Sequence, residues 1–382
     1  MTRVLIDGRI RGDDGIGRYT SCLTRALRAQ AGPGTHIEVL SPTGTPRYTR
    51  AEGEELLREA RACGAALIHV LDYRVPLEPT GIPVVVTIHD VLRLVRPQFC
   101  YSDKEFAARF GTDQLAELAA TTAALRDVTD PPPGETRRPE SLHEEFYARM
   151  LALACARAAG VVTPSRAVAR TLTTTLDLGC GVRVSPWGID HLPAGGPPVV
   201  DVIPVYGRYL LYVGQARAHK GLETLLDAYE RSRAPGAGVR LVCVGRDFTA
   251  GGPVAEHITA RLDRAAVAVG TVDDNLLREL YTHAEALVHL AEHEGFGFTP
   301  LEALAAGTRV VASDIPVLRE TLADHAHFTN PADPHAVAQA ISGVIAAPDE
   351  PEARQRRMRW ARRHRWSRHA DDVLALYAEA AR

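Results

Sequence analysis

Short runs of β-branched and other apolar residues alternate along the chain with segments whose apolar positions recur every three to four residues. The runs predict buried strands, and the spaced patterns predict amphipathic helices. Strands are expected at 4–6, 37–40, 67–71, 84–88, 161–163 and 182–185, and again at 209–213, 239–244, 287–290 and 310–312. This alternation is typical of parallel sheets wrapped by helices. The predicted fold class is therefore α/β from one end to the other.

Helical patterns fill the spaces between these strands. The long ones are expected at 103–126 and 142–159, and shorter ones at 273–283 and from Leu222, Thr299 and Trp366 onward. The two long helices are separated by an Asp-Pro-Pro-Pro-Gly segment at 130–134, which cannot continue a helix.

The chain of 382 residues is long enough for two domains. Residues 191–207 are rich in Pro and Gly without a clear period, and they are interpreted as a linker. It separates a Rossmann-like domain at 1–190 from a smaller one at 208–365, and the last helix, 366–382, is expected to cross back to the first domain. Open α/β sheets bind ligands at the carboxyl ends of their strands, so a cleft between the two halves is the expected site.

Composition and charge exclude several classes of function. The formal net charge is −3, without the basic stripe that nucleic-acid binding requires, so no nucleic-acid partner is expected. No apolar run reaches about 18 residues and no signal peptide is evident. We therefore expect a cytoplasmic protein without stable membrane insertion. Its six cysteines show no metal-binding spacing, and no metal site is predicted.

A nicotinamide dehydrogenase is the first function to test against a Rossmann-like pattern. Its fingerprint fails, because the third glycine after Gly15 and Gly17 is replaced by Thr20, and no acidic residue ends the second strand. Gly15 and Gly17 nevertheless open a helix directly, where backbone amides can face a polar ligand.

Two strand-to-helix turns in the second half carry a stronger signal. Glu294 and Glu302 flank a Gly-Phe-Gly-Phe-Thr-Pro-Leu segment, whose glycines let backbone amides at a helix start approach an anion. Upstream, a turn after the strand at 209–213 presents Arg217 and Lys220. Lys220 is one of only two lysines among 44 basic residues, the other being Lys104. These two turns predict a diphosphate site.

At this point the chain resembles the family-4 retaining glycosyltransferases, the E-x7-E type also called glycosyl transferases group 1, over nearly its whole length. The motifs occur in order: Gly15-Ile-Gly-Arg-Tyr19, Ile88-His-Asp90, Thr163-Pro-Ser165, Pro186-Trp-Gly-Ile-Asp190, Lys220-Gly221 and Glu294 to Glu302, followed by Ala303-Leu-Ala-Ala-Gly307. The resemblance implies the GT-B fold, in which two Rossmann-like domains with parallel sheets face a central cleft. It also implies a metal-independent hexosyl transfer with retention of configuration and no cofactor beyond the nucleotide-diphosphate sugar.

The resemblance also implies roles for individual residues. Glu294 contacts the donor sugar, Glu302 the ribose, Lys220 the diphosphate, and the backbone near Val272 the base. The turn amides, at Gly295, Phe296, Gly297 and Phe298, contact the diphosphate and sugar, and His89 lies beside the reacting carbon. One position departs from the family pattern, because Gln215 replaces an arginine that often follows the strand glycine, and Arg217 is its candidate substitute.

Each of these residues has a structural alternative. Thr299-Pro300-Leu301-Glu302 matches a capping box with Thr299 as N-cap and Glu302 at N3. Asp90 is equally well placed to cap the following element. A buried, hydrogen-bonded histidine and a solvated lysine are the corresponding alternatives for His89 and Lys220.

The acceptor is expected on the first domain. Acidic residues near the carboxyl ends of its strands are the candidates: Asp13, Asp14, Asp72 and Asp90. We interpret the acceptor as a small soluble molecule such as an aminocyclitol of antibiotic biosynthesis. Two alternatives stay open, a polysaccharide or cell-envelope glycosyltransferase and, from another class, a sugar-nucleotide epimerase of similar fold. The sequence leaves the sugar, the base and the oligomeric state undetermined.

Overall fold

The computed structural model describes residues 2–10, 12, 15–130, 137–193 and 207–382. The chain divides into two compact units, one formed by Met1–Trp187 with Trp366–Arg382 and the other by Gly188–Arg365. The expected domain boundary at 190 thus lies close to the division after Trp187. Most of the expected linker, 191–207, falls outside the described residues, as do Asp13 and Asp14.

Unit 1 contains a six-stranded sheet in the order β2-β1-β3-β4-β5-β6, with every neighbouring pair parallel. The order places the carboxyl ends of β1, β3 and β4 side by side, where ligands of open α/β sheets bind. Each expected strand of the first half is present: β1 (Thr2–Asp7), β2 (Thr35–Leu40), β3 (Leu67–Val70), β4 (Val84–Thr87), β5 (Gly160–Thr163) and β6 (Val182–Val184).

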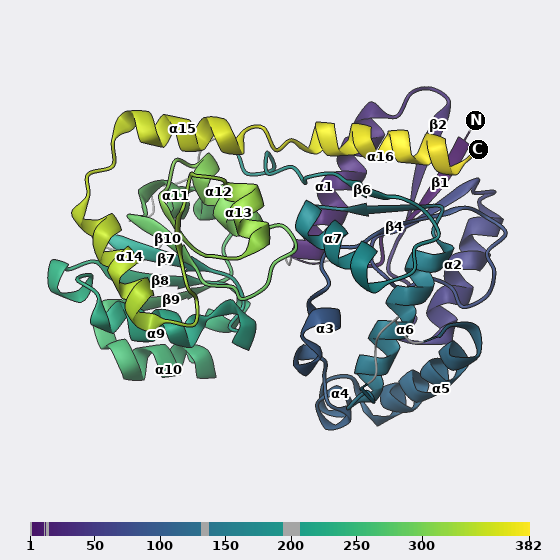
Figure 1. Ribbon diagram of the computed structural model, residues 1–382, viewed down its shortest axis with the longest axis horizontal. Coiled ribbons are helices and arrows are strands. Elements are labelled where there is room, and N and C mark those ends of the chain that lie inside the picture. Colours follow the sequence, from purple (N-terminus) through teal and green to yellow (C-terminus); the bar gives the residue numbers. More distant parts are fainter. Residues whose placement is uncertain (1, 11, 13–14, 131–136, 194–206) are drawn as a thin grey trace. The chain divides into compact units, whose positions relative to one another are not determined.

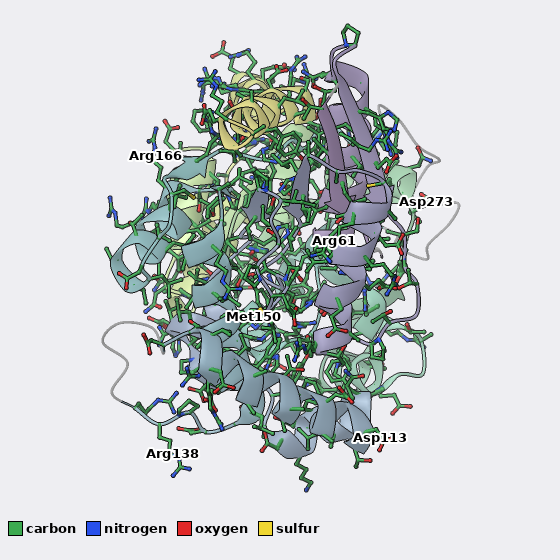
Figure 2. All side chains as sticks on the ribbon, turned by 90° about the vertical axis from the view of Figure 1, so that its right-hand side faces the viewer. Arg61, Asp113, Arg138, Met150, Arg166 and Asp273 are labelled. Carbon is green, nitrogen blue, oxygen red and sulfur yellow. The ribbon has the colours of Figure 1, made fainter. Side chains whose placement is uncertain are left out.

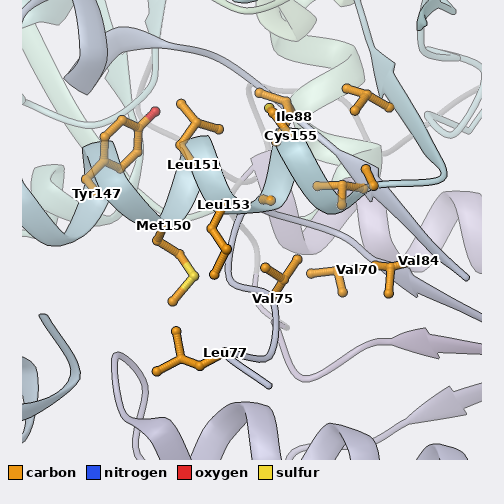
Figure 3. Close-up of a cluster of buried hydrophobic side chains, with 14 of the residues drawn as sticks. Val70, Val75, Leu77, Val84, Ile88, Tyr147, Met150, Leu151, Leu153 and Cys155 are labelled. Atoms are coloured by element: carbon orange, nitrogen blue, oxygen red, sulfur yellow. The ribbon is translucent and has the colours of Figure 1, made fainter. Parts of the chain in front are cut away.

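Helices cover both faces of this sheet (Figure 1). The helices are α1 (Gly15–Gln30), α2 (Arg50–Ala62), α3 (Leu92–Val95), α4 (Asp103–Phe110), α5 (Thr112–Val128), α6 (Leu142–Arg157), α7 (Arg166–Thr175) and α16 (Trp366–Ala380). One face packs against α2, α6 and α7 through alternate strand residues such as Val70 and Val84. Figure 3 shows part of this core, with Met150 and Leu153 of α6 on the side of the helix where Val70 and Val84 lie. In Figure 2, Met150 lies within the mass of side chains, whereas Asp113 and Arg138 project from its edge.

The opposite face is covered by α1 and the last helix of the chain, α16, which lie against each other. His69 and Thr87 point to this side, because side chains alternate along a strand. His69 bonds to Tyr377 of α16 (2.6 Å) and to Thr87 (2.8 Å), and Thr87 lies 3.1 Å from the Tyr19 hydroxyl of α1. The Tyr19 hydroxyl continues to His369 of α16 at 3.0 Å. A buried polar network therefore joins α16 to unit 1.

One predicted helix of unit 1 is wrong in its extent. The segment expected as a single helix at 103–126 is broken at Gly111, which has φ 99° and separates α4 from α5. A positive φ is readily accessible only to glycine, so the apolar spacing on either side does not carry the helix through this residue. The actual start at Asp103 is set by Ser102 and Glu105, which form a capping box.

Unit 2 repeats the architecture with a second parallel six-stranded sheet, in the order β12-β11-β10-β7-β8-β9. Its strands are β7 (Tyr209–Val213), β8 (Arg240–Val244), β9 (Ala266–Gly270), β10 (Ala286–His289), β11 (Val310–Ser313) and β12 (His327–Thr329). The pattern analysis missed both edge strands, β9 and β12. Their sequences, AVAVG and HFT, are too short or too alanine-rich to form a distinct β-branched run.

Seven α-helices are described in this unit: α9 (Leu222–Arg231), α10 (Pro253–Leu262), α11 (Asp274–His283), α12 (Phe298–Ala305), α13 (Pro316–Leu322), α14 (Pro334–Ala346) and α15 (Pro351–Ala361). They enclose a core built from β7, β8 and β10 with α9 and α14. Within the described residues, every helix of the chain is too short or too polar to cross a membrane.

Candidate functional site

The strand-to-helix turn after β10 requires glycine. Gly297 has φ 89°, and a β-carbon at this position would lie 2.7 Å from Leu318 Cδ2. Gly297 is also the N-cap residue of α12, and no described side chain caps this helix end. The positive end of α12 is thus set at the turn that the sequence analysis assigned to diphosphate binding.

The turn after β7 packs against the same region. Gly221 follows a short 3-10 helix, Ala218–Lys220, with φ 68°, and a β-carbon there would lie 2.5 Å from the carbonyl oxygen of Leu290. This close approach fixes the backbone of the neighbouring Lys220 beside the residues that follow β10. Two turns that are 74 residues apart in sequence therefore present their side chains to each other.

Lys220 and Glu294 form an ion pair, with 2.5 Å between Nζ and Oε1. His289, the last residue of β10, donates from Nε2 to the same carboxylate oxygen at 3.0 Å. Burial alone would raise the pKa of Glu294, but the charge of Lys220 and the hydrogen bond from His289 together lower it far below its ordinary value. Glu294 is therefore ionised at neutral pH, and Lys220 is not a solvated surface lysine.

Glu302 does not belong to a capping box, and that alternative is wrong. Helix α12 begins at Phe298 rather than after Thr299, so Glu302 lies in the second turn of the helix and is buried. Its Oε1 accepts a hydrogen bond from His191 Nε2 at 2.8 Å and its Oε2 accepts one from the Tyr281 hydroxyl at 2.9 Å. A buried carboxylate held by two side-chain donors is a binding group or a core element, not a helix cap.

The remaining predicted donor-site residues belong to the same unit. Phe296 is buried, Phe298 is half-buried, and their rings meet edge to face at 5.5 Å. Val272 is half-buried and precedes Asp273, the N-cap of α11. Arg217 is exposed at the start of the 3-10 helix.

In unit 1, His89 is buried just beyond the end of β4. Its Nε2 donates to the carbonyl oxygen of Leu71 at 2.6 Å, and its ring meets those of Tyr19 and Trp187 edge to face at 4.8 and 5.1 Å. The histidine is thus oriented by its surroundings. Gly17 is needed for close packing, because a β-carbon would lie 2.2 Å from the carbonyl oxygen of Gly12, whereas Gly15 is exposed.

The acidic acceptor candidates are engaged by neighbours. Asp72 is buried and pairs with Arg74 at 2.8 Å. Arg74 also pairs with Glu52 at 3.1 Å. Asp90 accepts a hydrogen bond from the Leu92 amide at 2.9 Å, as its capping alternative requires. These contacts give both aspartates a structural role.

Sequence reasoning missed three residues that contact the two glutamates: His289, His191 and Tyr281. Of these three, only His289 could have been recognised from the sequence, because it lies near the carboxyl end of an expected strand and five residues before Glu294. In the described part of the chain, no group of three or more His, Cys, Asp and Glu side chains is placed to hold a metal ion.

Comparison with known proteins shows a family similarity in the second half of the chain. Residues 201–365 match the family model of the glycosyl transferases group 1. Curated relatives include the O-antigen chain mannosyltransferase RfbU of Salmonella typhimurium, 33% identical over 37% of this chain and 39% of that protein. A phosphatidyl-myo-inositol mannosyltransferase of Mycolicibacterium smegmatis is 31% identical over 44% of each chain. The match thus spans less than half the length of each of these two relatives.

Solved structures extend the similarity to both units. HepE of Anabaena, solved in complex with UDP and glucose, superposes with a TM-score of 0.67 at 15% identity and covers 99% of each chain. Sucrose-phosphate synthase of Thermosynechococcus elongatus superposes with a TM-score of 0.61 at 20% identity, covering 100% of this chain and 96% of that one. These likenesses confirm the predicted fold class, two Rossmann-like units with parallel sheets. The match to the glycosyl transferases group 1 model, over residues 201–365, covers most of unit 2.

Proposed function

We propose that the chain is a glycosyltransferase that moves a hexosyl group from a nucleotide-diphosphate sugar to a hydroxyl group of its acceptor. One observation carries the proposal, the Lys220-Glu294-His289 cluster beside the uncapped start of α12, within the residues that match the glycosyl transferases group 1 model. The cation and the helix N-terminus suit a diphosphate, and the ionised carboxylate can accept hydrogen bonds from sugar hydroxyls.

Lys220 suits a diphosphate because its ammonium group carries three N–H donors and only one is used by Glu294. A diphosphate oxygen can therefore bind Lys220 while the ion pair persists. Glu294, held by His289, would accept hydrogen bonds from the donor sugar, and Glu302 from the ribose. The backbone near Val272 would meet the base. In this proposal the charge on the departing diphosphate is stabilised by protein groups, without a metal ion or further cofactor.

The proposed step breaks the bond between the anomeric carbon and the β-phosphate oxygen. The acceptor hydroxyl oxygen forms a new bond to the same carbon, on the same face of the sugar if configuration is retained as in family 4. The acceptor proton passes to the departing phosphate oxygen, so atoms and charge balance. His89 is proposed to lie beside the reacting carbon, where its bond to the Leu71 carbonyl keeps the ring in one orientation.

The named relatives favour a saccharide or glycolipid acceptor. They include an O-antigen chain mannosyltransferase, a phosphatidyl-myo-inositol mannosyltransferase and a glycogen synthase. None of these names supports the aminocyclitol expected from sequence, and we adopt the alternative of polysaccharide or cell-envelope synthesis.

The test is turnover of a panel of UDP-, GDP- and ADP-hexoses by the purified chain, with nucleotide release measured in the presence and absence of saccharide and glycolipid acceptors. Acceptor-dependent release of nucleoside diphosphate, lost in Glu294→Gln, is expected. Formation of an epimerised sugar nucleotide without acceptor would assign the fold to an epimerase instead. A chain that binds no sugar nucleotide would refute the proposal.

A further inference from the structure

An arginine with incomplete hydrogen bonding lies close in sequence to His89. Arg93 belongs to the short helix α3, which follows β4 at the carboxyl edge of the unit 1 sheet. Its side chain is half-buried, and its Nε is buried without a hydrogen-bond partner among the described residues. A buried donor without an acceptor costs free energy, so such a group calls for an explanation.

Other buried arginines of the same unit are neutralised. Arg9 pairs with Asp7 at 2.7 Å and with Glu55 at 2.9 Å, and Arg74 pairs with Asp72 and Glu52. The buried Nε of Arg93, by contrast, has no hydrogen-bond partner among the described residues. Asp90 acts on it only at longer range and holds the Leu92 amide instead. The Nε of this guanidinium cation is therefore left unsatisfied by the residues that the structure describes.

The surroundings of Arg93 gather further donors around one aromatic ring. The ring centre of Tyr101 lies 5.8 Å from the guanidinium carbon of Arg93 and 5.7 Å from that of Arg109, distances at which cations interact with a ring face. The imidazole of His143 lies 5.0 Å from the same ring centre. Arg93 and Tyr101 are half-buried and Arg109 is exposed, so a ligand can reach this cluster from solvent.

His143 supplies a second incomplete donor. Its Nδ1 accepts the Tyr101 amide at 3.1 Å, which leaves the proton on Nε2, and Nε2 is buried without a partner among the described residues. Burial and the nearby charge of Arg93 lower the pKa of His143 to about 3, so the ring is neutral. His143 itself is fully buried, so the groups that a ligand can reach are the two guanidinium groups beside Tyr101, and these favour an oxygen-rich, negatively charged partner.

We propose that Arg93, Arg109 and Tyr101 form a subsite for a phosphate group on the acceptor. The planar guanidinium fork matches the oxygens of a phosphate, and two arginines match the charge of about −1.5 to −2 that a phosphate monoester carries at neutral pH. The inference rests on the proposed function and narrows it to a phosphate-bearing saccharide acceptor. A sugar phosphate presents such a monoester, and a glycolipid such as phosphatidylinositol presents a phosphodiester with one negative charge; both offer phosphate oxygens to the guanidinium groups.

The experiment measures acceptor-side binding to the full chain by isothermal titration calorimetry. Glucose 6-phosphate is compared with glucose, and vesicles of phosphatidylinositol in phosphatidylcholine are compared with phosphatidylcholine alone. Arg93→Gln and Arg109→Gln are the test variants. Arg96→Gln, an exposed arginine at the end of the same helix, is the matched control. Arg93→Lys keeps the charge but loses the fork, and it replaces Arg93→Gln if that variant does not fold.

We expect one phosphate-bearing probe to bind at least tenfold more tightly than its phosphate-free counterpart, and the probe that does so identifies the source. Arg93→Gln and Arg109→Gln should each weaken this binding at least tenfold, while Arg96→Gln leaves it unchanged. Equal binding of both members of each pair, or equal loss in Arg96→Gln, would overturn the subsite. UDP and GDP titrations on the same proteins test the donor site in unit 2 separately. If the proposed function fails, neither nucleotide binds. If only the phosphate subsite fails, nucleotide binding persists.

Discussion

Lys220 and Lys104 are the only two lysines of the chain, and they differ sharply in environment. Lys220 is held by Glu294, whereas Lys104 is exposed on α4. In Lys220→Arg, the larger planar guanidinium cannot keep both the contact with Glu294 and a diphosphate oxygen at the place of a compact ammonium. The donor Kd should rise about tenfold, a loss of about 1.4 kcal/mol, with unchanged thermal stability.

Titration calorimetry with the best donor of the panel measures this effect. Lys104→Arg is the control and should bind the donor like the unmodified chain. Full donor affinity and turnover in Lys220→Arg would mean that the ammonium serves only the ion pair with Glu294.

The Glu302 carboxylate offers a second test, because its two oxygens accept from different donors. In Glu302→Gln the amide accepts at one oxygen only, and a lost hydrogen bond to a charged group costs about 1.5–3 kcal/mol of stability. Tyr281→Phe removes the bond to Oε2 but keeps the carboxylate. Both variants should therefore unfold at lower temperature, but only Glu302→Gln should raise the donor KM, by about tenfold.

Thermal unfolding and donor saturation curves on the two variants separate these roles. If both variants keep the donor KM of the unmodified chain, Glu302 is a core residue and the base and ribose are bound elsewhere.

At the residue scale, sequence identified the charged groups but not their partners. Lys220 and Glu294 stood out because of a rare residue type and a glycine-rich turn, both visible locally. Tyr281 and His191 contact Glu302 across 21 and 111 residues, and no local pattern encodes such distances. The same limit explains Arg93, whose missing partner becomes visible only once its neighbours are placed.

At the scale of elements, the turn that carries Lys220 depends on Gly221. Gly221 and Gly238 share a left-handed backbone, with φ 68° and 66°, but a β-carbon would meet Leu290 only at Gly221 and would find open space at Gly238. Gly238→Ala should cost about 1–2 kcal/mol of stability for the left-handed conformation alone. Gly221→Ala should cost about 1–3 kcal/mol more, because the backbone must shift.

Urea denaturation gives the two stabilities, and donor titration reports the position of Lys220. Gly221→Ala should weaken donor binding, whereas Gly238→Ala should not. Equal destabilisation by the two substitutions would show that the turn tolerates displacement from Leu290.

Elements were predictable where one physical signal dominated. Runs such as Val84-Val85-Val86 mark buried parallel strands whatever surrounds them. The start of α12 was misplaced because Thr299-Pro300 is a good local helix start, yet the positive φ of Gly297 and its contact with Leu318 begin the helix earlier. Tertiary packing overrode a correct local preference there.

At the scale of the whole molecule, the expected return of the last helix to the first domain rested on its amphipathic pattern and its position after an arginine-rich segment. The structure gives this helix a polar attachment that a pattern of apolar positions does not reveal. His369 of α16 bonds to Tyr19 at 3.0 Å and to Ser185 at 2.7 Å, deep inside unit 1. Sequence could not find this network because its members come from three distant segments.

The buried histidines of unit 1 make its stability depend on pH. Burial lowers the pKa of His69, His143 and His369 to about 3, so these rings stay neutral in the folded state down to that pH. In the unfolded chain they take up protons below about 6.5. The unfolded state therefore binds more protons between pH 6.5 and 3, and stability falls as the pH falls through this range, by up to about 4 kcal/mol per pH unit for three such groups.

Tryptophan fluorescence follows this loss in one unit, because Trp187 and Trp366 lie in unit 1 and the third tryptophan, Trp360, is removed by Trp360→Phe. In that background the urea midpoint of unit 1 should drop steeply from pH 7 to pH 5, a window above the ordinary pKa values of carboxylates. His69→Gln should reduce the slope by about 1.4 kcal/mol per pH unit, since one proton fewer is taken up on unfolding. His36 is exposed, so His36→Gln should leave this slope unchanged. A midpoint that stays level from pH 7 to pH 5 would mean that the buried histidines take up protons in the folded state.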